Sequence, residues 1–199
     1  ALRRAARAVQ CGDADIVACI GADTNHVESF RQGLANFSSF ARDATYPYGA
    51  GGPNSMFALI TDNYMRQFGA TRADFGRIAV SQRANAALNP NAMLRKPMSL
   101  EDYLRARPIA EPIHLLDCVM PCAGAEGFLV MREERAEALS LPHVKLRGAI
   151  ERHNAYADDP VMVRGGWLRD RDELYAQAGI SRADIDVIHT YDDYPVIVL

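Results

Sequence analysis

Long apolar runs and blocks of positive charge are both missing from this sequence of 199 residues, and each absence excludes a class of protein. No apolar run reaches the roughly 20 residues that a membrane-spanning helix requires. The first residues, ALRRAARAVQ, predict an amphipathic helix rather than the apolar segment and cleavage site of a secretory signal. Lys and Arg are scattered and the net charge is −3, which gives no sign of a nucleic-acid or membrane-surface partner. We therefore expect a cytoplasmic protein that binds a small molecule or another protein.

Cysteine is also scarce, with four in the chain: Cys11, Cys19, Cys118 and Cys122. This density is far below that of a small domain held together by disulfides. Cys118 and Cys122 form a CxxxC pair, and no second pair stands at metal-ligand spacing. The sequence therefore predicts no metal site.

The sequence does have a hydrophobic content of 49%, enough for a substantial core, and apolar runs that alternate with helical patterns. Three short apolar runs bounded by turns predict strands of a central mixed sheet: Asp15–Asp23, Gly124–Met131 and Ile185–Thr190. Alternating residues in His143–His153 and the apolar stretch Ile113–Cys118 predict two further strands.

Helices are predicted between these strands. Ser55–Phe68 and Arg169–Ala178 have apolar residues near helical spacing, and each is followed by glycine. Thr71 and Ser99 each stand three residues before an aspartate, the pattern of a capping box at a helix start. This alternation indicates a layered α/β fold, a mixed sheet with helices on both sides, in one region over residues 1–199.

Residues 24–54 interrupt the pattern with glycine, serine, asparagine and aromatic residues. About thirty such residues are too many for an ordinary connection, so we interpret them as a functional or dimer-contact excursion. The stretch YGAGGPNS, Tyr48–Ser55, precedes a helix and has two interpretations. Its backbone N–H groups suit a phosphate, but its spacing matches no known phosphate loop, and a turn with a helix cap is the interpretation we favour.

The stretch LLDCVMPCAGAEG raises the question of whether Cys118 or Cys122 is a nucleophile. A nucleophilic thiol needs a lowered pKa, from a helix N-terminus or a neighbouring base. Neither cysteine precedes a predicted helix, and on a strand His114 lies about 13 Å from Cys118. We favour buried, small apolar side chains at both positions.

The segment HTYDDYPVIVL places two tyrosines, two carboxylates and a histidine within six residues, after a predicted apolar strand. The carboxyl ends of strands in α/β sheets are where ligands collect. Tyr191 and His189 are groups that exchange protons with a substrate when a neighbour tunes them. The alternative is a polar strand end that leads into a solvated loop.

Taken in order, these residues resemble the thiolase superfamily, and within it the sterol carrier and lipid-transfer branch. The resemblance is carried by the helix pair that begins GGPNSMF, by the NPNA turn and by the phrase that ends Leu-Asp-Cys, and it extends nearly unbroken from Ala1 to Leu199. It implies a layered thiolase-like fold that is incomplete in this chain, which corresponds to about the middle half of a family member. The family's nucleophilic cysteine is expected before Ala1, and its Gly-His-Pro histidine and second cysteine after Leu199.

The resemblance also bears on the cysteines. Asp117, Cys118, Gly124 and Ala125 keep the family's pattern, in which this phrase is a loop into a core strand, whereas Cys122 replaces a serine. Ala123 and Glu126 depart from the pattern too, where relatives have aspartate and alanine. Cys118 and Cys122 are therefore expected to be structural.

The implied function is an enzyme that acts on acyl-CoA thioesters at a carbon–carbon bond, as an acyltransferase that performs thiolysis, with coenzyme A as part of the substrate and no tightly bound cofactor. One alternative is a thiolase-like aldolase that cleaves β-hydroxyacyl-CoA side chains by retro-aldol chemistry, and another is a non-catalytic lipid- or acyl-CoA-binding subunit. Tyr191 stands where relatives place a catalytic His or Tyr, so it is the predicted catalytic residue. The family further implies a homodimer or a place in a heteromer.

Overall fold

The computed structural model describes residues 1–199 except 25–31, 34–42, 44–45, 121, 160 and 162–163. Most of the excursion predicted at residues 24–54 therefore lies outside the described residues. The chain forms two compact units. Unit 1 comprises Ala1–Asn25, Cys122–Asp159 and Arg164–Ile188, and unit 2 comprises His26–Pro121, Pro160–Val163 and His189–Leu199.

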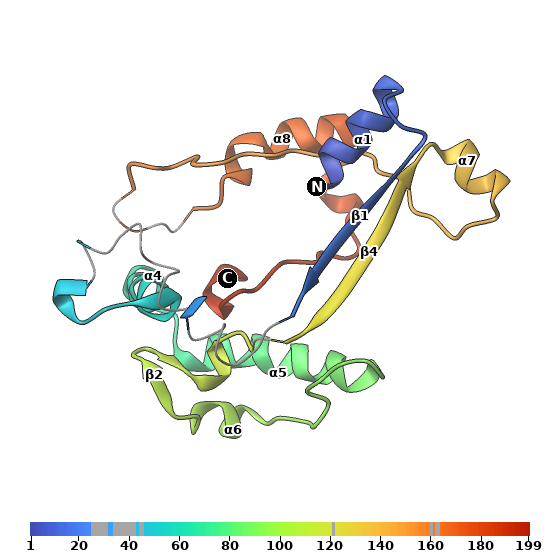
Figure 1. Ribbon diagram of the computed structural model, residues 1–199. Coiled ribbons are helices and arrows are strands. Elements are labelled where there is room, and N and C mark those ends of the chain that lie inside the picture. Colours follow the sequence, from blue (N-terminus) through green and yellow to red (C-terminus); the bar gives the residue numbers. More distant parts are fainter. Residues whose placement is uncertain (25–31, 34–42, 44–45, 121, 160, 162–163) are drawn as a thin grey trace. The chain divides into compact units, whose positions relative to one another are not determined.

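Unit 1 combines helices with one pair of strands (Figure 1). Its elements are α1 (Leu2–Cys11), β1 (Ile16–Asp23), β4 (Gly124–Met131), α7 (Glu133–Ala138), α8 (Trp167–Ala178) and the short 3-10 turn η4 (Arg182–Asp184). Both α1 and α8 end at a glycine in the left-handed region, Gly12 with φ 81° and Gly179 with φ 65°. Glycine has no Cβ to penalise this conformation, and the glycine predicted to end the helix at Arg169–Ala178 is confirmed.

The strands predicted at Asp15–Asp23 and Gly124–Met131 are confirmed, and they pair with each other as β1 and β4. Their register is antiparallel, with Ile16 opposite Met131 and Asp23 opposite Gly124. Figure 1 shows the two long strands side by side. Within the described chain β4 is the one partner of β1, and most side chains of β1 remain exposed.

Two other strand predictions are wrong. Residues 185–190 and 143–153 form no strand, and Val187 and Ile188 are 83% and 80% exposed. A strand needs a neighbouring strand to pair its backbone N–H and C=O groups, and no described strand of the chain offers one to these segments. An apolar sequence is not sufficient without that partner.

Unit 2 is mainly helical. Its elements are η2 (Tyr46–Tyr48), α4 (Gly52–Phe68), α5 (Arg72–Leu88), α6 (Leu100–Leu104), β2 (Pro108–Ala110), β3 (Ile113–His114), η3 (Leu115–Asp117) and η5 (Pro195–Ile197). They enclose a core of Ala58, Phe75, Tyr103, Ile113, Tyr194 and Val196. The strand predicted at Ile113–Cys118 is confirmed over two residues, after which the chain turns into η3.

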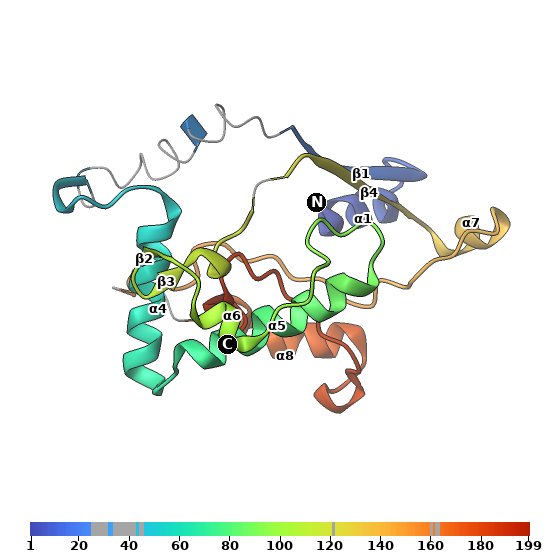
Figure 2. The same cartoon turned by 90° about the horizontal axis from the view of Figure 1, so that it is seen from below.

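The helix starts of unit 2 follow the sequence closely. The Asp74 carboxylate accepts from the backbone N–H of Thr71 at 2.8 Å, and the Asp102 carboxylate accepts from that of Ser99 at 2.9 Å, as the capping pattern predicts. The helix α6 lies against α5 (Figure 2). A Cβ placed on Gly76 would come within 2.6 Å of Tyr103, so this glycine permits the close approach.

The described helices include none that is both long enough and apolar enough to cross a bilayer. The observed mixture of helices and small sheets agrees with the predicted α/β class. The prediction of a single region over residues 1–199 stays a prediction beside the two compact units.

Candidate functional site

Asn54 joins the three segments of unit 2 that the sequence singles out. It lies in the first turn of α4, and its side-chain oxygen accepts a hydrogen bond from the Tyr194 hydroxyl at 2.5 Å. The thiol of Cys118 donates to the same oxygen at 3.5 Å. The side-chain amide of Asn54 therefore connects the glycine-rich stretch with the Leu-Asp-Cys phrase and with the segment Tyr191–Pro195, the YDDYP segment.

Tyr194 anchors the C-terminal segment in the core. It is 2% exposed, and its ring stacks on that of Phe57 with centroids 4.0 Å apart. Burial raises the pKa of the Tyr194 phenol, and the negative charge of Asp193 adds to the effect. The group is therefore a hydrogen-bond donor at neutral pH and fixes the segment that also carries Tyr191.

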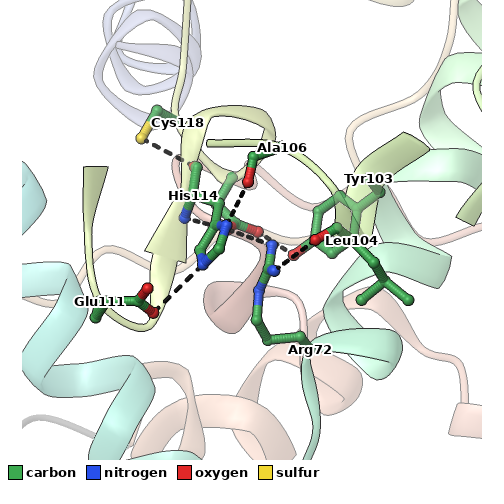
Figure 3. A network of polar contacts seen from close by, with 8 residues as sticks. Arg72, Tyr103, Leu104, Ala106, Glu111, His114 and Cys118 are labelled. Atoms are coloured by element: carbon green, nitrogen blue, oxygen red, sulfur yellow. Dashed lines mark hydrogen bonds and ion pairs between the residues drawn. The ribbon is translucent and has the colours of Figure 1, made fainter. Parts of the chain in front are cut away.

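A buried polar network holds the Leu-Asp-Cys phrase from the other side (Figure 3). The Asp117 carboxylate accepts from the fully buried Tyr103 hydroxyl and, at 2.7 Å, from the backbone N–H of His114. The guanidinium of Arg72 lies 3.9 Å from the same carboxylate and 5.1 Å from the centroid of the Tyr103 ring. A buried carboxylate is tolerated only with such partners, so Asp117 has a structural role.

The Arg72 side chain makes one hydrogen bond to the backbone and otherwise lies beside Asp117 and the Tyr103 ring. Its Nη1 donates to the carbonyl oxygen of Leu104 at 3.1 Å. Among the described residues, its Nε and Nη2 have no hydrogen-bond partner. No sequence motif identifies Arg72, Tyr103 or Asn54 as part of a site, and the one local signal is the position of Arg72 directly after the Thr71 cap.

His114 and Cys118 are closer than the sequence predicts. The Cys118 sulfur lies 3.5 Å from the His114 carbonyl oxygen, because η3 folds the chain back where a strand would have extended it by about 13 Å. The His114 ring turns elsewhere: Nδ1 contacts the Ala106 carbonyl oxygen at 2.5 Å and Nε2 contacts Glu111 at 3.3 Å (Figure 3). His114 therefore offers Cys118 a carbonyl rather than a base.

The two cysteines of this phrase differ. Burial raises the pKa of the Cys118 thiol to about 11, and the charge of Asp117 adds to the effect. The thiolate is the nucleophilic form, so Cys118 has the properties of a structural residue, as expected. The expected burial of Cys122 is wrong, since this side chain is exposed.

Tyr191 lies on the surface of unit 2 and is 75% exposed. Its hydroxyl donates to the Asp193 carboxylate at 3.4 Å, and the charge of Asp193 is the main cause of a raised pKa for the phenol. His189 is exposed as well, and Asp192 is half-buried. Because residues 185–190 form no strand, Tyr191 does not follow a strand end in this structure, and its catalytic role stays a prediction.

The glycine-rich stretch has the geometry of a turn and helix start. Gly51 precedes α4, and Gly52 has φ 72°, in the left-handed region. The Ser55 hydroxyl donates to the Gly51 carbonyl oxygen at 3.4 Å. This agrees with the favoured interpretation, and a role in phosphate binding stays untested.

One group of metal-ligating residue types occurs among the described residues. Ligand atoms of Glu133, Glu137 and His143 lie within 4.8 Å of one another, and all three residues are exposed. The ammonium of Lys145 already lies 2.5 Å from Glu133. Exposed acidic groups with a lysine partner are ordinary surface features, so the group supports no metal assignment.

Comparison with known proteins identifies the family. No family profile matches the chain. It is 34% identical to the steroid side-chain-cleaving aldolase of Thermomonospora curvata, over 100% of this chain and 54% of that protein. It is 28% identical to the benzoylsuccinyl-CoA thiolase subunit BbsB of Thauera aromatica, over 100% of this chain and 52% of the subunit. The solved structure of an Ltp2-ChsH2(DUF35) aldolase matches with a TM-score of 0.79 at 31% identity, over 100% of this chain and 53% of that one.

The comparisons confirm that the chain resembles the thiolase superfamily. Its resemblance to the sterol carrier and lipid-transfer branch is confirmed as well. It spans about half the length of the curated relatives it matches. The environment of Cys118 agrees with the structural role that the family pattern implies.

Proposed function

We propose that this chain is part of an enzyme that acts on an acyl-CoA thioester at a carbon–carbon bond, and that the reaction is retro-aldol cleavage of a β-hydroxyacyl-CoA. The sequence alone favours thiolysis, with the aldolase as alternative. Two similar proteins named as aldolases, each matched over 100% of this chain at 31% identity or more, now give the aldolase at least equal support. The activity belongs to the whole protein, of which this chain matches about half.

The chemistry required fits the groups of the YDDYP segment. In a retro-aldol cleavage a base takes the proton of the β-hydroxyl, the Cα–Cβ bond breaks, and a carbonyl product leaves. The electron pair passes to the thioester enolate, which is stabilised by a hydrogen-bond donor and then protonated at carbon. No covalent bond between enzyme and acyl group is needed.

The exposed phenol of Tyr191 is the observation that carries this proposal. The neighbouring Asp193 charge raises its pKa, so at neutral pH the phenol keeps its proton. A protonated phenol suits the donor to the enolate oxygen better than the base. Its accessibility, at 75% exposed, leaves the hydroxyl available to a ligand.

The test uses the full-length protein and compares Tyr191→Phe with Tyr48→Phe. Tyr48 is an exposed tyrosine of η2, so the control makes the same chemical change away from the YDDYP segment. We expect Tyr191→Phe to lower kcat by about 10²-fold, the scale of losing one oxyanion donor, with an unchanged melting temperature. An unchanged kcat for release of the carbonyl product would remove Tyr191 from the mechanism.

Thiolysis is the second candidate, favoured by the likeness to a thiolase subunit. It consumes free coenzyme A and requires a cysteine nucleophile, whereas the retro-aldol reaction requires neither. Product formation without added coenzyme A, and resistance to iodoacetamide, would favour the aldolase. Product formation that requires added coenzyme A and is lost after iodoacetamide treatment would favour thiolysis. The absence of both reactions would favour a non-catalytic acyl-CoA-binding subunit.

We also propose that the protein works as a homodimer or within a heteromer. The BbsB relative is named as a subunit, and the matched solved structure is named with a second component. Sedimentation of the full-length protein at micromolar concentration is the direct test. A monomer there, with full activity, would contradict the proposal.

A further inference from the structure

A groove in unit 1 gathers three arginines. Its wall is formed by α1, the end of α8 and the irregular segment around Leu146–Ala149. Arg3, Arg7 and Arg147 contribute the charge, and the amides of Gln10 and Gln177 are further polar groups. None of the described residues that line the groove is acidic. The net charge of the chain is −3, so this positive surface is a local feature rather than a general one.

The helix α1 presents one face to the groove. Arg3, Arg7 and Gln10 recur at helical spacing, which puts them on the same side of the helix. The buried residues Ala5 and Val9 occupy a different side. The guanidinium groups of Arg3 and Arg7 are therefore on a different side of α1 from its packed face.

Arg147 is brought to the groove by a segment that packs tightly on α8. A Cβ on Gly148 would lie 3.1 Å from both Leu174 Cδ1 and the Leu174 carbonyl oxygen, so the backbone passes close to the helix. The backbone N–H of Ala149 donates to the Gln177 side-chain oxygen at 3.4 Å. A Cβ placed on Gly179 would lie 3.5 Å from Nη2 of Arg147. The guanidinium of Arg147 is therefore close to the C-terminal end of α8, the negative end of the helix dipole.

Neighbouring arginines are paired with carboxylates, and the charge of Arg3 also acts on Asp170, whose pKa it helps to lower, but Arg7 and Arg147 have no such partner within the described chain. Arg4 pairs with Glu151 at 3.2 Å, and Arg152 holds the Asp170 carboxylate through two contacts of 2.5 Å. Within the described chain, Arg7 and Arg147 form no hydrogen bond or ion pair. Two like charges that face one concave surface without a counter-charge favour binding of an anion.

We propose that the groove bounded by Arg3, Arg7 and Arg147 binds a diphosphate group. Guanidinium groups recognise phosphate oxygens through paired hydrogen bonds, and several of them around one site suit an anion with more than one negative charge. The groove has a volume of about 230 Å³. This is below the ~300–1,000 Å³ of sites that enclose a drug-sized ligand, which favours a compact anion or the diphosphate part of a larger molecule.

The test measures binding to the full-length protein by titration calorimetry, with inorganic diphosphate as the probe. We expect binding that weakens when NaCl is raised from roughly 50 to roughly 200 mM, because salt screens the attraction. Arg7→Gln and Arg147→Gln should each raise the Kd by about tenfold or more, the scale of one charge-assisted contact. Glutamine keeps helix propensity at position 7, so this variant should fold even if Arg147→Gln does not.

Two controls separate the groove from general charge effects. Arg95→Gln makes the same charge change at an exposed loop position of unit 2, and Arg4→Gln makes it on α1 at an arginine already paired with Glu151. Both should bind diphosphate within about twofold of the parent protein. Equal weakening in Arg7→Gln and Arg95→Gln would overturn the proposal, as would the absence of diphosphate binding at millimolar concentration.

The source of the diphosphate is resolved by three further probes. Tighter binding of coenzyme A than of inorganic diphosphate, lost in Arg7→Gln, would assign the groove to a diphosphate within a nucleotide. Equal or weaker binding of coenzyme A would assign it to the free anion. Pantetheine, which lacks the diphosphate, should not bind the groove in either case. A polyglutamate peptide that binds this groove more tightly than diphosphate would overturn the proposal in favour of an acidic protein segment.

Discussion

The Tyr194 hydroxyl donates a hydrogen bond to the side-chain oxygen of Asn54 across 140 positions of sequence. This contact ties the C-terminal segment to the first turn of α4. The Cys118 thiol shares the same acceptor, so Asn54 serves two donors from different segments. The position of the YDDYP segment in unit 2 therefore depends on one amide as well as on the aromatic stacking of Tyr194 with Phe57.

We expect Tyr194→Phe and Asn54→Ala, which each remove this hydrogen bond, to lower the free energy of unfolding by different amounts. Tyr194→Phe removes one donor and keeps the ring stacked on Phe57, which should lower the free energy of unfolding by about 1 kcal/mol. Asn54→Ala leaves the buried Tyr194 hydroxyl without its acceptor, at a cost of about 1–3 kcal/mol. Urea unfolding of both single variants and the double variant measures the coupling. Strict additivity would contradict the contact.

Asp117→Asn tests the buried network around Arg72. The substitution keeps the size of the side chain and removes its charge, which leaves the Arg72 guanidinium in unit 2 without its carboxylate. We expect a loss of about 3 kcal/mol in the free energy of unfolding, the lower end for breaking a buried ion pair. Glu111→Gln makes the same kind of change at an exposed carboxylate and should cost less than about 0.5 kcal/mol. Similar values for the two variants would mean that the Asp117 charge has no such role.

Much of the local structure could be predicted from the sequence, because its signals act over a few residues. The cap of Thr71 and the glycine after α8 were identified from adjacent residues, and the structure confirms both. The apolar pattern of residues 185–190 also predicts a strand, but strand formation depends on a distant partner that no local pattern specifies. The sequence alone likewise could not predict that Asn54 and Tyr194 meet.

The site shows the same division between local and distant information. The family pattern implies a structural role for Cys118 and Cys122. The half-buried Cys118, with its raised pKa, agrees with that role, whereas Cys122 is exposed. The distance between His114 and Cys118 was overestimated, since one 3-10 turn replaced an expected strand. Arg72 and Tyr103 enter the network from other elements, which no spacing within the Leu-Asp-Cys phrase could reveal.

Alkaline pH should destabilise the protein through its buried tyrosines. Burial raises the pKa of Tyr103, with the Asp117 hydrogen bond adding to the effect, and burial raises that of Tyr194. The unfolded chain has tyrosine pKa values near 10, so the folded state holds these protons more tightly. This contribution to stability is complete below about pH 10 and is lost as the pH rises through the folded-state values.

Urea unfolding at several pH values between about 8 and 11 checks this expectation. Stability should fall above about pH 10, and the fall should be shallower in Tyr103→Phe and in Tyr194→Phe, because each variant lacks one titrating phenol. Tyr48→Phe, at an exposed position, is the matched control and should follow the parent protein. A parallel decline in all four proteins would assign the alkaline effect to other groups.

Cys118 should resist alkylation at neutral pH. Its pKa of about 11 leaves almost no thiolate at pH 7.5, and its sulfur contacts Asn54 and the His114 carbonyl oxygen inside unit 2. Cys11 is exposed and serves as the internal control. Mass spectrometry after iodoacetamide treatment should find Cys11 modified and Cys118 intact, with modification of Cys118 rising in urea or as the pH approaches 11.

Cys118→Ser should lower the free energy of unfolding by about 1 kcal/mol and leave turnover of the full-length enzyme largely unchanged, as expected for a structural thiol. Rapid modification of Cys118 in the folded protein, together with loss of turnover by several orders of magnitude in Cys118→Ser, would make this cysteine the nucleophile and would favour thiolysis over the retro-aldol reaction.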